Sequence, residues 1–309
     1  MITGRPPRPT LLVTLSAAAC LALAAWQPAT GQARGTRLVI LGTGTPTADP
    51  DRSGPALAIV VGREAYLVDA GPGIVRRASA AAMRGMPALI ATNLRRVFIT
   101  HLHSDHTLGL PDLMFTPWPL GRRTPLDVYG PPGIERMARR IEEAWADDIA
   151  VRVNGPEALR QPNYRAVAHE IKAPGQVYDD GTVRVDALAV EHVTPWAFGF
   201  RFRTPDRTIV VSGDARPSPS LIEACNKCDV LVHEVYSKEF LAMHRTSTYH
   251  TSAHTSTAQV AEIAKKTQPG LLVLYHQLYG PASDADLERE VREAGYAGKV
   301  ASARDLDVF

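Results

Sequence analysis

Three histidines and one aspartate fall within six residues, directly behind an apolar segment. His101, His103, Asp105 and His106 follow residues 96–100, whose pattern is typical of a β-strand. Neutral imidazole and carboxylate are the groups that hold zinc in catalytic sites. In an extended chain His101 and His103 point to the same side and could share one ion. We expect Asp105 and His106 to point elsewhere and to suit a second, adjacent ion. The segment therefore predicts a metal centre at the end of a strand.

Three more potential metal ligands also come directly after apolar, strand-like runs. They are His192, Asp214 and His276. Side chains at strand ends are held by a rigid scaffold and can face a shared cleft. One such residue is more often an ordinary core or loop residue, but four strands that each lead to a potential ligand favour a common site.

Short apolar strands alternate with helical stretches through most of the chain. We predict strands at residues 37–41, 56–61, 65–68, 96–100, 126–129, 164–171, 183–190, 198–203, 208–212, 230–233 and 271–275. We predict helices at residues 74–92, 133–148, 219–225, 255–266 and 284–293. This order indicates an α/β protein in which helices cover β-sheets. The 45% hydrophobic content is sufficient for one large core, and we assign residues 34–309 to a single domain.

The first 33 residues differ from the rest of the chain. Arg5 and Arg8 precede an apolar run over residues 10–26, and a small-x-small motif ends at Ala33. We interpret residues 1–33 as an export signal peptide that is cut after Ala33, because the apolar run is short for a membrane-spanning helix. A retained membrane anchor and a lipoprotein are the less favoured alternatives. The mature protein is then expected in the periplasm or outside the cell, with no stable membrane span.

The charge balance narrows the class of partner. The formal net charge is +2, and removal of two arginines with residues 1–33 leaves a balanced chain. Proteins that bind long nucleic acids usually carry a basic excess, so a small substrate is favoured over a large polyanion. The pairs Arg122-Arg123 and Arg139-Arg140 are interpreted as solvated surface.

Two cysteines, Cys225 and Cys228, remain after the predicted cleavage. They are too few to complete a four-ligand zinc site, and the thioredoxin-like context of a redox motif is absent. In an oxidising compartment they could form a local disulfide. Two half-buried thiols at the end of a helix are an equally good interpretation.

At this point the chain resembles the metallo-β-lactamase-fold hydrolases, and within them the ribonuclease Z, phosphodiesterase and arylsulfatase-like branch. The resemblance covers residues 37 to about 300. The motifs that carry it are Leu41-Gly42-Thr43-Gly44-Thr45-Pro46, Tyr66-Leu67-Val68-Asp69-Ala70-Gly71, His101 to Pro111, Tyr129-Gly130-Pro131-Pro132-Gly133, Glu191-His192, Ser212-Gly213-Asp214, His233-Glu234, His254-Thr255-Ser256 and Tyr275-His276. It implies a four-layer αββα sandwich with mixed sheets and helices on the outer faces.

The resemblance also implies the metal ligands. Two Zn²⁺ ions per chain are expected, although other divalent metals could take their place. One ion would be held by His101, His103 and His192, the other by Asp105, His106 and His276, with Asp214 between both. A metal-held hydroxide, oriented in part by Asp105, would be the nucleophile.

Two further residues resemble the proton relay of the ribonuclease Z branch. His254 would donate a proton to the leaving oxygen, and Glu234 would hold His254 in its charged form. The alternative is that His254 caps a helix that begins at Thr255. Asp69, between an apolar strand and Gly71, is expected to orient a loop or a ligand from behind.

Departures from ribonuclease Z limit the choice of function. Gln277-Leu278-Tyr279-Gly280 stands where that family carries a serine and an arginine suited to phosphate, and residues 133–192 show no obvious basic arm for transfer RNA. Export also argues against a cytosolic transfer RNA substrate. We therefore expect an exported dinuclear zinc hydrolase that cleaves a small phosphodiester or related ester by metal-hydroxide attack.

Five alternatives remain. An arylsulfatase would place a similar tetrahedral charge on the same metals. A β-lactamase is disfavoured by Asp214 and by Glu191-His192-Val193-Thr194-Pro195, and thioesterases or lactonases by the absence of their Gly-His-Thr-x-Gly segment. A ribonuclease Z-like endonuclease and a non-catalytic zinc-dependent binding protein complete the set. The resemblance also implies a homodimer.

Overall fold

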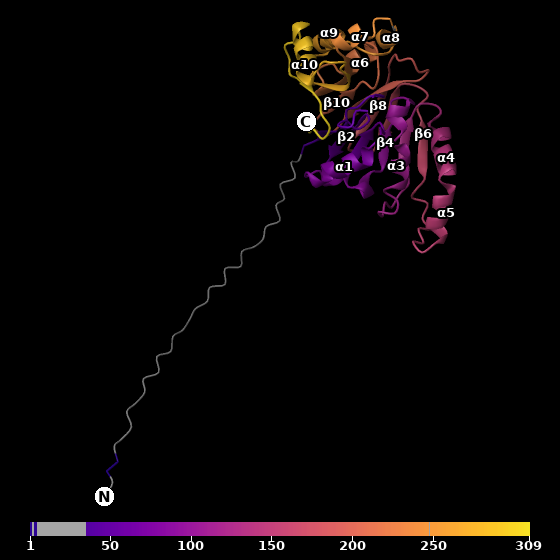
Figure 1. Cartoon of the computed structure of the whole chain (residues 1–309), viewed down its shortest axis with the longest axis vertical. Helices are drawn as coiled ribbons and strands as arrows, with labels where there is room; N and C mark the ends of the chain where they lie inside the picture. Colours follow the sequence, from indigo (N-terminus) through magenta and orange to yellow (C-terminus); the bar gives the residue numbers. More distant parts are fainter. Residues whose placement is uncertain (2, 5–34, 247) are drawn as a thin grey trace. The chain divides into compact units, whose positions relative to one another are not determined.

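The computed structural model describes residues 1, 3–4, 35–246 and 248–309. Most of the predicted export signal, including its apolar run and cleavage site, lies outside the described residues. Residues Gly35–Phe309 form one unit that contains two β-sheets (Figure 1). In the part of the chain that the structure describes, no helix has the length and apolar character needed to span a membrane.

The first sheet has six strands that lie side by side in chain order. The first three strands pair antiparallel and the later neighbours pair parallel. The six strands are β1 (Arg37–Gly42), β2 (Ala56–Val61), β3 (Glu64–Val68), β4 (Arg96–Phe98), β5 (Leu126–Gly130) and β6 (Ala166–Glu170).

The second sheet has seven strands in the order β13-β12-β11-β10-β9-β8-β7. Its strands from β10 to β13 pair parallel and those from β7 to β10 pair antiparallel, so this sheet is also mixed. The seven strands are β7 (Gly175–Asp179), β8 (Arg184–Ala189), β9 (Phe198–Arg203), β10 (Thr208–Val211), β11 (Val230–Tyr236), β12 (Leu271–Leu278) and β13 (Val300–Ser302).

Ten α-helices and two short 3-10 helices connect the strands in the described residues. They are α1 (Ile74–Met83), η1 (Pro87–Leu89), η2 (Ala91–Asn93), α2 (Ser104–Thr107), α3 (Leu110–Phe115), α4 (Ile134–Ala144), α5 (Ala146–Asn154), α6 (Pro219–Ala224), α7 (Lys238–Met243), α8 (Tyr249–Ala253), α9 (Thr257–Thr267) and α10 (Asp284–Glu293).

Three buried clusters of apolar side chains define four layers. The central cluster lies between the sheets, where the rings of Phe98 and Phe200 are 5.7 Å apart. A second cluster joins the first sheet to α1, α3 and α4, and a third joins the second sheet to α6, α9 and α10. The two sets of helices lie on opposite outer faces (Figure 1). The αββα sandwich that the sequence predicts is therefore confirmed.

Most strands and helices lie where the sequence predicts them, and some differences have a local cause. The helix predicted over residues 74–92 ends at Met83, because Gly85 adopts a left-handed conformation with φ of 97° and Pro87 follows. The helix predicted over residues 133–148 is divided at Trp145 into α4 and α5. The edge strands β7 and β13 and the short helices α2, α3, α7 and α8 were not predicted, since their short segments carry little periodicity of their own.

Candidate metal centre

The structure brings all seven sequence-predicted ligands together from both sheets. His101 and His103 lie in the loop after β4, and Asp105 and His106 lie in α2. His192 follows β8 and Asp214 follows β10, whereas His276 lies within β12. The centre is therefore formed where loops of the first sheet meet the strand ends of the second.

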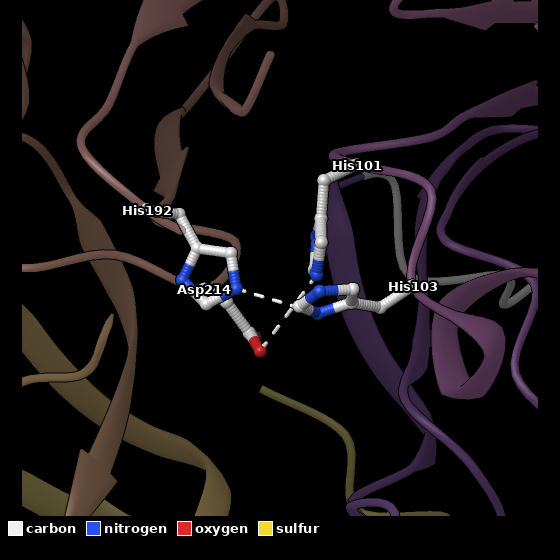
Figure 2. A group of neighbouring side chains, drawn as sticks. All are labelled: His101, His103, His192 and Asp214. Atoms are coloured by element: carbon white, nitrogen blue, oxygen red, sulfur yellow. Dashed lines mark hydrogen bonds and ion pairs between the residues drawn. The ribbon is translucent and has the colours of Figure 1, made fainter. Parts of the chain in front are cut away.

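Four side chains form the first ligand group. The ligand atoms of His101, His103, His192 and Asp214 lie within 4.8 Å of one another. Nε2 of His192 is 3.4 Å from Nδ1 of His103, and Nε2 of His101 is 3.9 Å from Oδ2 of Asp214. Figure 2 shows the three rings and the carboxylate pointing toward one another from opposite sides of the centre.

Three side chains form the second group, beside the first. The ligand atoms of Asp105, His106 and His276 also lie within 4.8 Å of one another. Nε2 of His276 is 3.2 Å from Oδ2 of Asp105, and Nε2 of His106 is 3.4 Å from the same oxygen. Asp214 reaches this group as well, with its oxygens 3.4 Å from His106 and 3.6 Å from His276. Its carboxylate thus faces both groups.

The unpaired atoms in this cluster fit metal ions. Nε2 of His101, Nε2 of His106 and Oδ1 of Asp214 are buried without a hydrogen-bond partner, although buried polar atoms are nearly always paired. Burial and the neighbouring His106 hold the pKa of His101 well below its usual value, which favours the neutral, ligating imidazole. Imidazole nitrogen with carboxylate oxygen is a donor set that zinc accepts.

The carboxylates make the centre favourable for positive charge. Burial alone would raise the pKa of Asp214, but His276 and His106 hold that pKa well below its usual range, so the carboxyl is ionised. For the imidazole of His106 burial acts in the other direction and would lower the pKa, yet Asp214 and Asp69 raise that pKa well above its ordinary value. Negative charge thus outweighs desolvation here, and a cation is the species that such a site attracts.

Groups behind the ligands orient the imidazoles. Nδ1 of His106 lies 2.8 Å from Oδ2 of Asp69, and the other oxygen of Asp69 accepts a hydrogen bond of 2.8 Å from the backbone N–H of Thr100. Nδ1 of His192 lies 2.9 Å from the carbonyl oxygen of Ala253. Both contacts place the ring hydrogen on Nδ1 and leave Nε2 for the centre. Asp69 therefore lies where the sequence predicts it, behind a candidate ligand.

His276 differs from the prediction that it follows a strand. Strand β12 continues through it to Leu278, and the register with β11 shifts there, since Tyr275 pairs with Glu234 and Gln277 with Val235. His276 is the extra residue of this β-bulge and has a φ of 45°. A bulge re-aims one side chain without ending the strand, which turns His276 into the centre.

Glu234 and His254 lie together at the border of the centre. Nδ1 of His254 is 3.4 Å from Oε1 of the fully buried Glu234 and 4.0 Å from Asp214. Burial opposes protonation of His254, but Glu234 raises its pKa to about 9. The capping alternative is wrong, because α9 begins at Thr257 and Ser256 is its cap. His254, Asp214 and His276 also form a third group that could hold an ion.

One aromatic side chain beside the centre was not selected from the sequence. The ring of Tyr249, in α8, lies 6.0 Å from that of His254. Its only sequence signal is its position five residues before His254. The ring of His250 contacts that of Tyr249, and His250 and His244 both pack against Phe240.

Comparison with known proteins agrees with this geometry. A family model described as a beta-lactamase superfamily domain matches residues 64–277. The chain belongs to this superfamily. Ribonuclease Z of Mycobacterium bovis (strain BCG / Pasteur 1173P2) is 31% identical over 277 residues, which cover 87% of this chain and 96% of that protein. Ribonuclease Z of Mycobacterium marinum is 32% identical over 279 residues, with the same coverage.

Solved structures show the same fold. The metallo-beta-lactamase fold protein YhfI of Bacillus subtilis superposes with a TM-score of 0.68 at 18% identity and covers 89% of this chain and 99% of its own. The short form of human tRNase Z has a TM-score of 0.65 at 23% identity and covers 88% and 98%. The family match, the curated relatives and the two ligand groups agree with one another. The protein is therefore a metal-dependent hydrolase of the ribonuclease Z and phosphodiesterase branch of this superfamily.

Proposed function

We propose that this hydrolase is an exported dinuclear zinc enzyme that cleaves a small phosphodiester or a related ester. The observation that carries the proposal is the position of Asp214. Its carboxylate lies 3.9 Å from His101 in the first ligand group and 3.4 Å from His106 in the second. One carboxylate that faces two adjacent groups is suited to two ions that share it. When bound, such a pair of zinc ions supplies Lewis acidity that activates water and polarises the ester.

The side chains of this chain would divide the remaining work. The seven ligands hold the ions, and Asp69 keeps His106 in the orientation that presents Nε2. Asp105 lies between His106 and His276 and helps to orient the attacking water. His254 carries a proton that Glu234 stabilises, so it can donate that proton to the departing oxygen as the ester bond breaks.

Two local features support a small substrate. Three basic side chains on α4 and α5 are paired with acidic neighbours: Arg139 and Arg140 with Glu143, and Arg152 with Asp148. Gln277, behind the last ligand, is buried and donates hydrogen bonds to the carbonyl oxygens of Leu274 and Ala303. It is therefore directed into the core and away from a substrate phosphate.

A second candidate is a ribonuclease Z-like endonuclease, which the 31–32% identity to curated ribonucleases Z favours. Zinc-replete protein without residues 1–33 would be assayed with aryl phosphodiesters, aryl sulfates, thioesters, lactones, β-lactams and precursor transfer RNA. Fastest turnover of the phosphodiester supports the main proposal, and fastest cleavage of the RNA supports the second. Fastest turnover of the aryl sulfate would identify a sulfate ester as the related ester. A preference for the thioester, lactone or β-lactam, or no turnover at all, would contradict both candidates.

The number of zinc ions is tested by metal analysis of gel-filtered protein. We expect two zinc ions per chain in the wild type and fewer in Asp214→Ala, because Asp214 serves both groups. His169→Ala is the matched control, since His169 pairs with Asp127 at the surface and should leave the content at two. A wild-type content of one, or an unchanged content in Asp214→Ala, would be inconsistent with the dinuclear proposal.

The role of His254 is tested by His254→Ala. We expect a loss of about 10²- to 10⁴-fold in turnover, which is the usual contribution of a general acid. The variant should keep both zinc ions, because His254 is not among the seven ligands. Full turnover with both ions retained would remove the proton-donor role, and loss of an ion would assign His254 to the third ligand group instead.

Export is supported by the N-terminal sequence and by the disulfide between Cys225 and Cys228. Disulfides persist mainly in oxidising compartments. The test is cell fractionation of the full chain, followed by thiol blocking and mass spectrometry. We expect a periplasmic or secreted protein that begins after Ala33 and resists blocking at both cysteines. A full-length protein in the cytoplasm with reactive thiols would refute export.

A further inference from the structure

Four rings from α7 and α8 form a continuous layer beside His254. We call Phe240, His244, Tyr249 and His250 the aromatic layer. The ring of Phe240 lies 4.2 Å from that of His244 and 4.7 Å from that of His250. The ring of Tyr249 lies 5.2 Å from that of His250 at an interplanar angle of 86°. These contacts hold each ring against the next.

Tyr249 is the member of the aromatic layer that borders the metal centre. Its ring lies 6.0 Å from that of His254, and the residue is 44% exposed although it is large and hydrophobic. Burial of part of the ring raises the pKa of its phenol, and the negative charges of Asp214 and Asp105 raise it further. Tyr249 is therefore an exposed aromatic residue beside His254, at the border of the candidate ligands.

The proposed chemistry places one part of the substrate next to this ring. The following step rests on the proposed function. If His254 protonates the departing oxygen, the group attached to that oxygen must lie on the His254 side of the centre, where Tyr249 is exposed. A tyrosine ring binds a planar aromatic group by stacking or edge contact more strongly than it binds a small alkyl group.

We infer that Tyr249 is a specificity-determining residue that binds a planar aromatic leaving group. The natural substrate class is then an aryl ester of phosphate or of a similar tetrahedral acid. The ring of His250 contacts that of Tyr249, and Phe240 in turn packs against His250, so this layer helps to hold Tyr249 beside His254. The ring, and not the hydroxyl, makes the contact with the aryl group.

The test compares two phosphate monoesters on zinc-loaded protein, one of which keeps the bond between phosphate and an aryl group. The dissociation constants of phenyl phosphate and methyl phosphate are measured by titration calorimetry for wild type, Tyr249→Ala and Tyr249→Phe. We expect phenyl phosphate to bind about three- to tenfold more tightly than methyl phosphate to the wild type. This preference should disappear in Tyr249→Ala and remain in Tyr249→Phe, which keeps the ring.

Trp145→Ala is the matched control, because Trp145 is a comparably exposed aromatic residue, 40% exposed, located between α4 and α5. It should leave the preference unchanged. Equal binding of the two ligands to the wild type, no binding of either, or a preference that survives Tyr249→Ala would overturn the inference. Loss of the preference in Tyr249→Phe would assign the contact to the hydroxyl and would also overturn it.

The same variants separate this inference from the proposed function. Turnover of bis(p-nitrophenyl) phosphate by the wild type tests the hydrolase activity, and the inference predicts that Tyr249→Ala raises KM for this aryl substrate. If turnover is observed but Tyr249→Ala leaves KM unchanged, the inference fails and the proposed function stands. If turnover is absent but the phenyl preference requires the Tyr249 ring, the proposed function fails and the aromatic subsite stands.

Discussion

At the scale of single residues, the metal centre depends on which nitrogen each histidine presents. Asp69 lies 2.8 Å from Nδ1 of His106, and the carbonyl of Ala253 lies 2.9 Å from Nδ1 of His192. Each acceptor holds one ring hydrogen and thereby leaves Nε2 for the centre. The sequence identified the ligands by their residue types. It gave for Asp69, which is 37 residues from His106, only the expectation that it orients a loop or a ligand, and not that its partner is His106.

Replacement of Asp69 tests this orientation. In Asp69→Asn the amide can present a donor to Nδ1 of His106, which would disfavour the tautomer that leaves Nε2 free. We expect affinity for one zinc ion to fall about 10- to 100-fold, measured by competition with a chelator. Asp127→Asn is the control, because Asp127 forms a similar 3.0 Å pair with His169 at the surface. Equal zinc affinity in all three proteins would show that Asp69 has no orienting role.

At the scale of elements, a buried arginine joins α3 to the segment that precedes β6. Arg122 is only 1% exposed, so its interpretation as solvated surface was wrong. Its guanidinium donates to the carbonyl oxygens of Leu113, Met114 and Asn163 at 2.6, 2.8 and 2.7 Å. Burial lowers its pKa to about 10, which still leaves it charged at neutral pH. A pair of adjacent arginines in the sequence does not distinguish which one is buried.

The two members of this pair form a matched experiment. Arg122→Ala should lower the free energy of unfolding by about 3 kcal/mol, because the carbonyl groups that the guanidinium bonds lose their donor and a buried space is left. Arg123→Ala, at an exposed position, should change it by less than about 0.5 kcal/mol. Urea unfolding followed by circular dichroism gives both values. Similar effects of the two substitutions would mean that burial of Arg122 does not contribute.

At the scale of the whole fold, a polar contact links the two sheets at one end of the core. Asp180 accepts hydrogen bonds from Tyr66 of the first sheet at 2.6 Å and from Tyr178 of the second at 2.9 Å. Burial opposes ionisation of Asp180, but the bond from Tyr66 and the backbone N–H groups of Val183 and Thr182 outweigh it and lower its pKa to about 2. The guanidinium of Arg96 lies over both tyrosine rings.

This shift predicts how stability depends on pH. Because the pKa of Asp180 is lower in the folded protein than the unfolded value of about 3.9, its contribution is complete above pH 4 and is lost as the pH falls toward 2. Asp180→Asn should therefore be less stable than wild type at pH 5, by about 1 kcal/mol or less at this exposed position, and the difference should shrink by pH 2.5. The measurement is urea unfolding at three pH values. A difference in stability between Asp180→Asn and wild type that stays constant with pH would contradict this dependence.

The sequence by itself determined an α/β protein with helix-covered sheets, most strands and the seven candidate ligands, because alternating apolar runs and clustered histidines are local patterns. The four-layer arrangement was implied by the resemblance to a known family. Tertiary structure alone decided the bulge that directs His276 toward Asp105, across 171 residues, and the burial of Arg122. It also decided the approach of Tyr249 to His254. These features depend on how separate elements pack, and the free energy of such contacts is not encoded in any short segment.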